Sequence, residues 1–399
     1  MSTTGGPGRR VAVVGAGVSG LALATFLARD GWHVTVLERT PDLGPVGAGI
    51  LLQHLGQQVA HRLGIGEALR ALSAPVRRVD GATTSGMTTM SFAYADGVPG
   101  AMGWGVHRGD LFTLLHEAAV DAGAVVVPRC EVVGLRRSGT GWSVEAADGV
   151  VHGPFDLVVG ADGAGSRVRA LAFEPRTDRR YGWGAVWAIV PDPEHLAGDA
   201  LVQRWRDTRT TLGLLPTGRD RVSIFWSVRA READAVVAAG PAAFVDRVAP
   251  LAGRFAPLVE RVADVGLLPA RYRDVVVGSP VGDRVVLVGD AAHAMSPQLG
   301  IGASMGLADA WSLAWALREH RDVGAALAAH ADLRRRHVTA YRWLSMLLTP
   351  VFQSGLVPIG PPRDAALAVA CRTGFVRRQA VSLLMGTRLL PRGTWSLPG

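Results

Sequence analysis

The sequence contains no lysine and no asparagine, so all 42 of its positively charged side chains are arginine. Lysine and asparagine codons are AT-rich, and a GC-rich genome therefore explains both absences most simply. The formal net charge of +8 carries correspondingly little functional weight. Because the arginines form no basic stretch interleaved with aromatic residues, we expect no nucleic-acid partner.

Cysteine is nearly absent, and long apolar runs are missing. Cys130 and Cys371 belong to no CxxC or His-Cys pattern, so we expect no metal site. No run of about 18 uncharged apolar residues is present, and we expect no integral membrane segment. The opening residues contain no apolar signal core, so we expect the protein in the cytoplasm.

A glycine-rich turn follows the first apolar, β-branched run at residues 11–14, and residues 21–28 then read as a helix. Gly15 permits a tight turn, Gly17 lets the backbone approach a pyrophosphate, and Gly20 lets helix and strand pack closely. The pyrophosphate would sit on amide groups at the helix start, around Val18 and Ser19. Glu38 and Arg39 end the next predicted strand, where Glu38 is placed to accept from adenosine ribose hydroxyls. The pattern predicts a dinucleotide site.

Two later segments narrow the choice of dinucleotide. Residues 157–169 read as a buried strand running into Asp162-Gly163, and residues 285–293 as a second strand ending in Gly289-Asp290. With these motifs, in this order, the chain resembles the class A flavoprotein aromatic hydroxylases, the para-hydroxybenzoate hydroxylase-like FAD monooxygenases. The resemblance spans nearly the whole chain.

The resemblance assigns further residues to FAD. It places Asp290 on the ribityl chain, Asp162 near the pyrophosphate and NAD(P)H, and Arg108 in contact with FAD. Gly49 belongs to a loop, residues 47–50, that resembles the segment passing along the isoalloxazine ring. At Val132 the backbone would meet adenine, although a plain strand valine is equally compatible. Pro297 would lie beside the reactive face of the flavin, or it simply ends its loop. Gly300 and Gly302 precede a helix whose amides would point at the flavin.

We expect an α/β fold in which a Rossmann-like FAD domain is interleaved with a β-sheet substrate domain and followed by a helical C-terminal cap. At 399 residues the chain should form more than one packed unit. The expected FAD domain comprises residues 1–75, 100–180 and 271–320, the substrate domain residues 76–99 and 181–270, and the cap residues 321–399. Arginines 334–336 read as a solvated helix face. His293 is expected to be hydrogen-bonded within its own loop rather than to act as a base.

Tryptophans give an indication of the substrate, and residues 347–354 resemble a stretch seen in relatives that act on quinones and polyketides. Trp183 and Trp187 are four residues apart on a predicted strand and therefore share a face; Trp226 is expected on a neighbouring strand. Facing the flavin, these three would hold a planar apolar substrate, and facing helices they would be ordinary core. Trp104 and Trp205 are candidates beside them.

The resemblance implies an FAD- and NAD(P)H-dependent monooxygenase. It would insert one oxygen atom from O2 into an aromatic or polyketide-like natural product through a flavin C4a-hydroperoxide. NADH or NADPH as reductant, the substrate and the oligomeric state stay open. The alternatives are a dehydrogenase or reductase, or a non-catalytic flavoprotein, on the same scaffold. Residues 183–191 also resemble the tryptophan motif of flavin-dependent halogenases. Halogenases use a lysine, however, and this chain has none, which argues against a halogenase.

Overall fold

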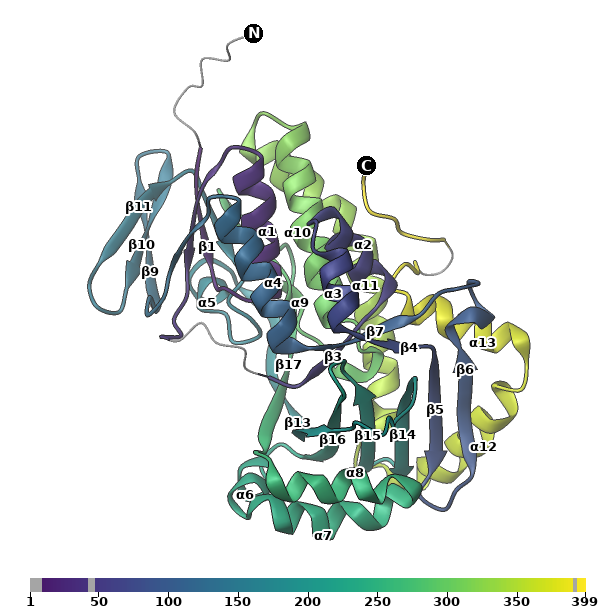
Figure 1. The fold of residues 1–399 in the computed structure, drawn as a ribbon. Helices are drawn as coiled ribbons and strands as arrows, with labels where there is room; N and C mark the ends of the chain where they lie inside the picture. The colour runs from purple at the N-terminus through teal and green to yellow at the C-terminus, as the bar shows by residue number, and fades with distance from the viewer. Residues whose placement is uncertain (1–8, 42–46, 390–392) are drawn as a thin grey trace.

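A parallel five-stranded sheet forms the centre of the upper part of the molecule in Figure 1. The computed structural model describes residues 9–41, 47–389 and 393–399. The strand order is β18-β12-β1-β2-β8, with β18 Val285–Leu287, β12 Leu157–Gly160, β1 Arg10–Val14, β2 His33–Leu37 and β8 Val125–Val127.

Both faces of this sheet are buried, which is why β1 reads as an unbroken apolar run. Val11 and Val13 pack into one core, shared with the helices α1 Val18–Arg29, α4 Arg108–Asp121 and α10 Gly302–Glu319. Ala12 and Val14 pack into a second core on the other face, under an antiparallel sheet. That sheet has the order β11-β10-β9, with β9 Val132–Ser138, β10 Gly141–Ala146 and β11 Val151–Phe155.

The second large sheet has seven strands in the order β17-β13-β16-β15-β14-β5-β6. Their bounds are β5 Arg78–Thr83, β6 Thr88–Ala93, β13 Pro175–Pro191, β14 Ala200–Arg206, β15 Thr210–Pro216, β16 Arg221–Arg229 and β17 Leu268–Val277. One face is covered by α6 Ala233–Ala238, α7 Gly240–Ala252 and α8 Ala256–Glu260, which lie below the sheet in Figure 1. The strands β13 and β17 run across the expected domain boundaries at residues 180 and 271.

A small sheet joins the two parts. It has the order β3-β7-β4, with β3 Gly49–Leu52, β7 Gly103–His107 and β4 Ala74–Val76. The helices around it and beside the parallel sheet are α2 His54–Arg62, α3 Gly66–Leu72, α5 Arg167–Ala172 and α9 Asp290–His293.

Helices dominate the C-terminal region, as expected. The long helix α11 Val323–Phe352 packs on α10, and α12 Gly360–Ala370 and α13 Gly374–Leu384 cover β6 at the right of Figure 1. In the described part of the chain, no single helix is long and apolar enough to cross a membrane. The pair formed by α11 and residues Val357–Ala370, which is bent by 98°, passes the test on length and composition alone.

Candidate functional site

The glycine-rich turn lies at the carboxyl end of β1, where backbone segments approach one another closely. Gly15 has a φ of +104°, and a Cβ atom there would lie 2.6 Å from the Ala161 carbonyl oxygen. A Cβ on Gly20 would lie 2.0 Å from the Gly15 carbonyl oxygen. Both positions therefore require glycine. Gly17, the residue before α1, is exposed.

Glu38 directs its carboxylate at this turn. Its Oε2 accepts a hydrogen bond from the Ala16 amide at 2.7 Å, and its Oε1 accepts from the amide and hydroxyl of Thr40 at 2.9 and 2.8 Å. Each carboxylate oxygen can accept more than one hydrogen bond, so Glu38 retains capacity for ribose hydroxyls. Arg39 beside it is exposed.

The turn at Gly289 and Asp290 packs against the start of α1. Gly289 has a φ of +59°, and a Cβ atom there would lie 2.3 Å from the Ser19 hydroxyl oxygen. The Asp290 carboxylate is next to the beginning of α10, because a Cβ on Gly302 would lie 3.9 Å from Asp290 Oδ1. Asp290 and Gly302 are both exposed, as is Gly300, whose φ of +58° reverses the chain before α10.

Two helix N-termini meet at these loops. Neither α1 nor α10 has a side-chain N-cap or an acidic residue in its first turn. Their first amides are therefore left for other acceptors, and the helix dipoles favour negative charge there. Together with the Glu38 and Asp290 carboxylates, this donor and acceptor set fits the pyrophosphate, ribose and ribityl groups of FAD.

Asp162 and Val132 are used mainly inside the fold. Asp162 Oδ1 accepts from the Ser166 hydroxyl at 2.5 Å, and Oδ2 accepts from the amides of Arg167 and Val168 at 2.6 and 3.1 Å, so the side chain holds the start of α5. Its backbone lies against Gly15. The Val132 side chain belongs to the core under the antiparallel sheet. Their expected roles at FAD stay predictions.

The loop before β3 meets Arg108 on one side and the second sheet on the other. A Cβ on Gly47 would lie 2.6 Å from Arg108 Cδ, and the Gly49 amide donates to Ser223 Oγ at 3.0 Å. A Cβ on Gly49 would come within 2.6 Å of both Ser223 Cβ and Thr217 Cγ2. The small size of Gly49 therefore serves contact between the two parts of the fold.

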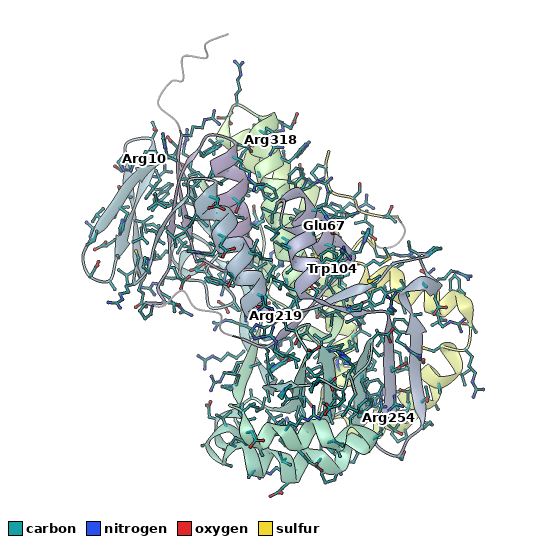
Figure 2. The ribbon with its side chains drawn as sticks, viewed as in Figure 1. Arg10, Glu67, Trp104, Arg219, Arg254 and Arg318 are labelled. Atoms are coloured by element: carbon teal, nitrogen blue, oxygen red, sulfur yellow. The ribbon has the colours of Figure 1, made fainter. Side chains whose placement is uncertain are left out.

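An ion pair fixes the same junction two residues further along α4. Asp110 Oδ2 accepts from Arg221 Nη2 at 2.7 Å and lies 3.9 Å from Arg219 Nε, and Figure 2 shows Arg219 where α4 approaches the second sheet. Arg108, at the start of α4, is thereby held at the edge of the site.

Sequence reasoning missed a buried carboxylate beneath the Gly289 turn. Asp309 on α10 accepts from the Gly289 amide at 2.8 Å and from Arg334 Nε at 2.6 Å, and lies 2.6 Å from His293 Nε2. Burial opposes ionisation, but the neighbouring His293 and Arg334 outweigh it and hold the pKa of Asp309 well below its usual range. The partner of His293 is thus on α10 rather than in its own loop, which corrects our expectation.

Arg334 corrects a second expectation. The run 334–336 was expected to face solvent, but the Arg334 side chain is only 3% exposed because it pairs with Asp309. It also contacts His337, whose Nε2 lies 2.7 Å from the Gly386 carbonyl oxygen, and its guanidinium lies over the Trp395 ring. The sequence feature that could have predicted this network is Asp309, a single acid among the buried apolar residues of α10. The network links the Gly289 turn to α11 and the C-terminal segment.

The face of the second sheet opposite its covering helices carries Trp187 and Phe225, whose ring centroids are 4.8 Å apart. This face is turned toward the loops described above, because Ser223, two residues from Phe225, bonds the Gly49 amide. Tyr272 adjoins Trp187, and burial raises the pKa of Tyr272 to about 12. These aromatic side chains are neutral at physiological pH.

Trp226 does not share this face. It pairs with Val186 and packs edge-on against Phe244 of α7, with ring centroids 5.8 Å apart, so its expected place in a pocket with Trp187 is wrong. Trp183 is buried under the Arg229 guanidinium. Trp104 and Trp205 are core residues, 5% and 1% exposed.

Pro297 is exposed at the start of a short turn, Pro297–Leu299, that leads to Gly300. The next residue, Gln298, donates through Nε2 to Gln353 Oε1 at 3.0 Å, and Gln353 Nε2 donates to the Gly184 carbonyl oxygen at 3.1 Å. These amides connect the Pro297 turn to β13. The Trp187–Phe225 face therefore lies between the Pro297 turn and the Gly47–Gly49 loop.

Comparisons with known proteins agree with this geometry. The family model described as "FAD binding domain" matches residues 9–340. The chain is 30% identical to the aurachin C monooxygenase/isomerase of Stigmatella aurantiaca, over 82% of this chain and 85% of the relative. It is 31% identical to a 6-hydroxynicotinate 3-monooxygenase of Pseudomonas fluorescens, over 78% of this chain and 83% of the relative.

Solved structures show the same fold. The tetrameric form of 2-methyl-3-hydroxypyridine-5-carboxylic acid oxygenase superposes with a TM-score of 0.80 at 24% identity, covering 99% of this chain and 100% of that chain. Klebsiella pneumoniae HpxO, solved with FAD and uric acid, gives a TM-score of 0.81 at 22% identity, covering 95% and 97%.

Proposed function

The chain belongs to the class A FAD-dependent aromatic hydroxylases, and from this premise we propose that it inserts one oxygen atom from O2 into a neutral, planar heteroaromatic compound, with NADH or NADPH as reductant. FAD, when bound, supplies the electron transfer and the oxygen activation that side chains alone cannot provide. The residues of this chain bind that cofactor, exclude water and orient the substrate.

We assign cofactor binding to the loops at the ends of β1, β2 and β18. The first amides of α1 would hold the pyrophosphate, Glu38 the adenosine ribose, and Asp290 the ribityl chain. The first amides of α10 would stabilise negative charge on the reduced flavin. Asp162 and Arg108 lie at the edges of this arrangement.

The substrate class is inferred from the aromatic face between the Pro297 turn and the Gly47–Gly49 loop. Trp187 and Phe225 offer flat apolar surface, and Tyr272 adds an uncharged hydroxyl, whose pKa burial raises further, to about 12. Gln298 and Gln353 add amide donors and acceptors without charge. This set suits a neutral ring system carrying a carbonyl or ring nitrogen better than a carboxylated ring.

The aromatic pair of Trp187 and Phe225 on this face carries the proposal, and a substrate panel tests it. NADH and NADPH oxidation by the FAD-loaded protein should accelerate with neutral quinolones or hydroxyquinolines and respond little to 6-hydroxynicotinate. The Trp187→Leu variant should raise KM about tenfold, since an aromatic contact contributes roughly 0.5–1.5 kcal/mol beyond its buried area. The matched Trp226→Leu variant, altered on the opposite face, should keep the same KM. A preference for the carboxylated ring, or equal KM effects of the two variants, would contradict the proposal.

A further inference from the structure

The positive charge of the chain is concentrated at its C-terminal end. Residues 333–399 contain ten arginines and one acid, Asp364, a net charge of +9, so the preceding 332 residues carry a net charge of −1 within the total of +8. Asp364 is buried, where it accepts hydrogen bonds from Trp205 Nε1 at 3.0 Å and Arg363 Nε at 2.8 Å. The described surface of residues 333–389 and 393–399 therefore presents mainly arginines, and the exposed Asp332, just before this segment, lies 3.6 Å from Arg335.

The outer face of α11 combines this charge with exposed apolar side chains. Trp343, Met346 and Leu347 follow the i, i+3, i+4 spacing of one helix face and are 49%, 40% and 64% exposed. Arg336, seven residues before Trp343, lies on the same face two turns earlier, and Arg335 is beside it; both are exposed.

Two further exposed apolar side chains follow the end of α11 in the sequence. Leu356 and Ile359, in the segment between α11 and α12, are 51% and 37% exposed. We define the C-terminal face by the α11 residues Arg335, Arg336, Arg342, Trp343, Met346 and Leu347. Large apolar side chains grouped on a surface in this way mark an interaction site.

A hollow of about 290 Å³ adjoins the basic end of this face. It lies between residues Val275–Pro280, which include the end of β17 and the segment after it, and the α11 residues Arg335, Thr339 and Arg342. Arg342 Nε is buried and has no hydrogen-bond partner among the described residues. The lining also includes two carboxylates: Asp309, which pairs with Arg334, and Asp332, which lies 3.6 Å from Arg335. Arg342 and Thr339 remain as guanidinium and hydroxyl donors for a phosphate group, beside Trp343 in the sequence.

We propose that the C-terminal face docks the protein onto a membrane surface that contains anionic lipids. Lipid phosphates bind Arg335, Arg336 and Arg342, while Trp343, Met346 and Leu347 enter the boundary between headgroups and acyl chains. A helix with arginines and adjacent tryptophan and leucine on its solvent face suits this interfacial position.

The charge of the face also explains why a lipid surface is favoured over a second copy of the chain. Pairing two C-terminal faces would bring arginines together, and the exposed Asp332, which lies 3.6 Å from Arg335, would offset only part of this charge. An anionic bilayer supplies the missing negative charge. The docking depends on none of the residues assigned to FAD or substrate.

Co-sedimentation of the full-length, FAD-loaded protein with vesicles tests the proposal. Binding should be strong to mixed phosphatidylglycerol–phosphatidylcholine vesicles, weak to pure phosphatidylcholine, and reduced by high salt. Arg335→Gln/Arg336→Gln should lower the partition coefficient by about fivefold for each arginine removed. Leu347→Ser should lower it as well, because its apolar side chain no longer leaves water.

Matched control variants lie elsewhere on the surface. Arg231→Gln/Arg247→Gln changes two exposed arginines near the α6–α7 helices, and Val125→Ser changes a side chain that is 60% exposed, close to the 64% of Leu347. All variants should keep full FAD content, and the controls should bind vesicles like the unmodified chain. The proposal is overturned if the C-terminal variants bind vesicles as well as the controls do. It is equally overturned if light scattering shows that they change only the oligomeric state.

Discussion

Replacing Asp309 by asparagine would remove the charge at the centre of the network beneath the Gly289 turn. The Asp309 and Arg334 side chains are each 3% exposed and lie 2.6 Å apart. Breaking a buried pair by removing one partner costs about 3–5 kcal/mol, because the other charge stays buried and unpaired. We expect a loss of this size in the free energy of unfolding.

The same substitution should weaken FAD binding. The Gly289 amide would donate to a neutral acceptor instead of a charged one, a difference of roughly 1 kcal/mol. Since this hydrogen bond holds the turn that carries Asp290, we expect FAD affinity to fall about fivefold. Equilibrium denaturation and FAD titration of the purified protein would measure the two effects separately.

Two further variants make the reasoning about Asp309 refutable. Asp309→Asn/Arg334→Met removes both charges and should recover much of the lost stability, as replacement of buried pairs by apolar groups often does. Arg335→Met, at the exposed neighbouring position, should change stability by less than about 0.5 kcal/mol. If Asp309→Asn unfolds at the same denaturant concentration as the unmodified chain and binds FAD equally well, the network does not hold the turn.

Three further outcomes follow from the structure. Asp290→Ala should lower FAD affinity about ten- to hundredfold in a titration, since a charged hydrogen bond contributes roughly 1.5–3 kcal/mol, whereas the exposed Asp246→Ala should leave it unchanged. Gly49→Val should cost about 1–3 kcal/mol of stability in urea denaturation, because its side chain would collide with Ser223; unchanged stability would disprove that contact. Burial lowers the pKa of His330 from 6.5 to about 4, so the unfolded chain takes up a proton in that window and the folded chain does not. Stability should therefore be full above pH 6.5 and fall by on the order of 3 kcal/mol toward pH 4, and this part of the pH dependence should vanish in His330→Gln.

The sequence predicts the strand–turn–helix unit of β1 and α1 well because its signals are local. Gly15 and Gly20 are required by close backbone contacts at one strand–turn–helix unit, and this unit can be predicted from its own residues.

The misplaced residues depend on contacts between distant segments. In the run 334–336, helical geometry turns one arginine inward, and its partner Asp309 lies 25 residues earlier. Trp226 faces the helices because it pairs with Val186, whereas its neighbour Phe225 pairs with Trp187. A shift of one residue in register would reverse these faces, and the sequence of a single strand does not specify that register.

Isotope labelling of the product tests the central claim most directly. The FAD-loaded protein, NAD(P)H and an accepted heteroaromatic substrate would react under ¹⁸O2, and the mass of the product would be measured by mass spectrometry. We predict that the product carries one labelled oxygen atom, with one NAD(P)H consumed for each product molecule formed. A product without labelled oxygen, with O2 converted only to hydrogen peroxide, would contradict the monooxygenase assignment and favour a dehydrogenase on the same scaffold.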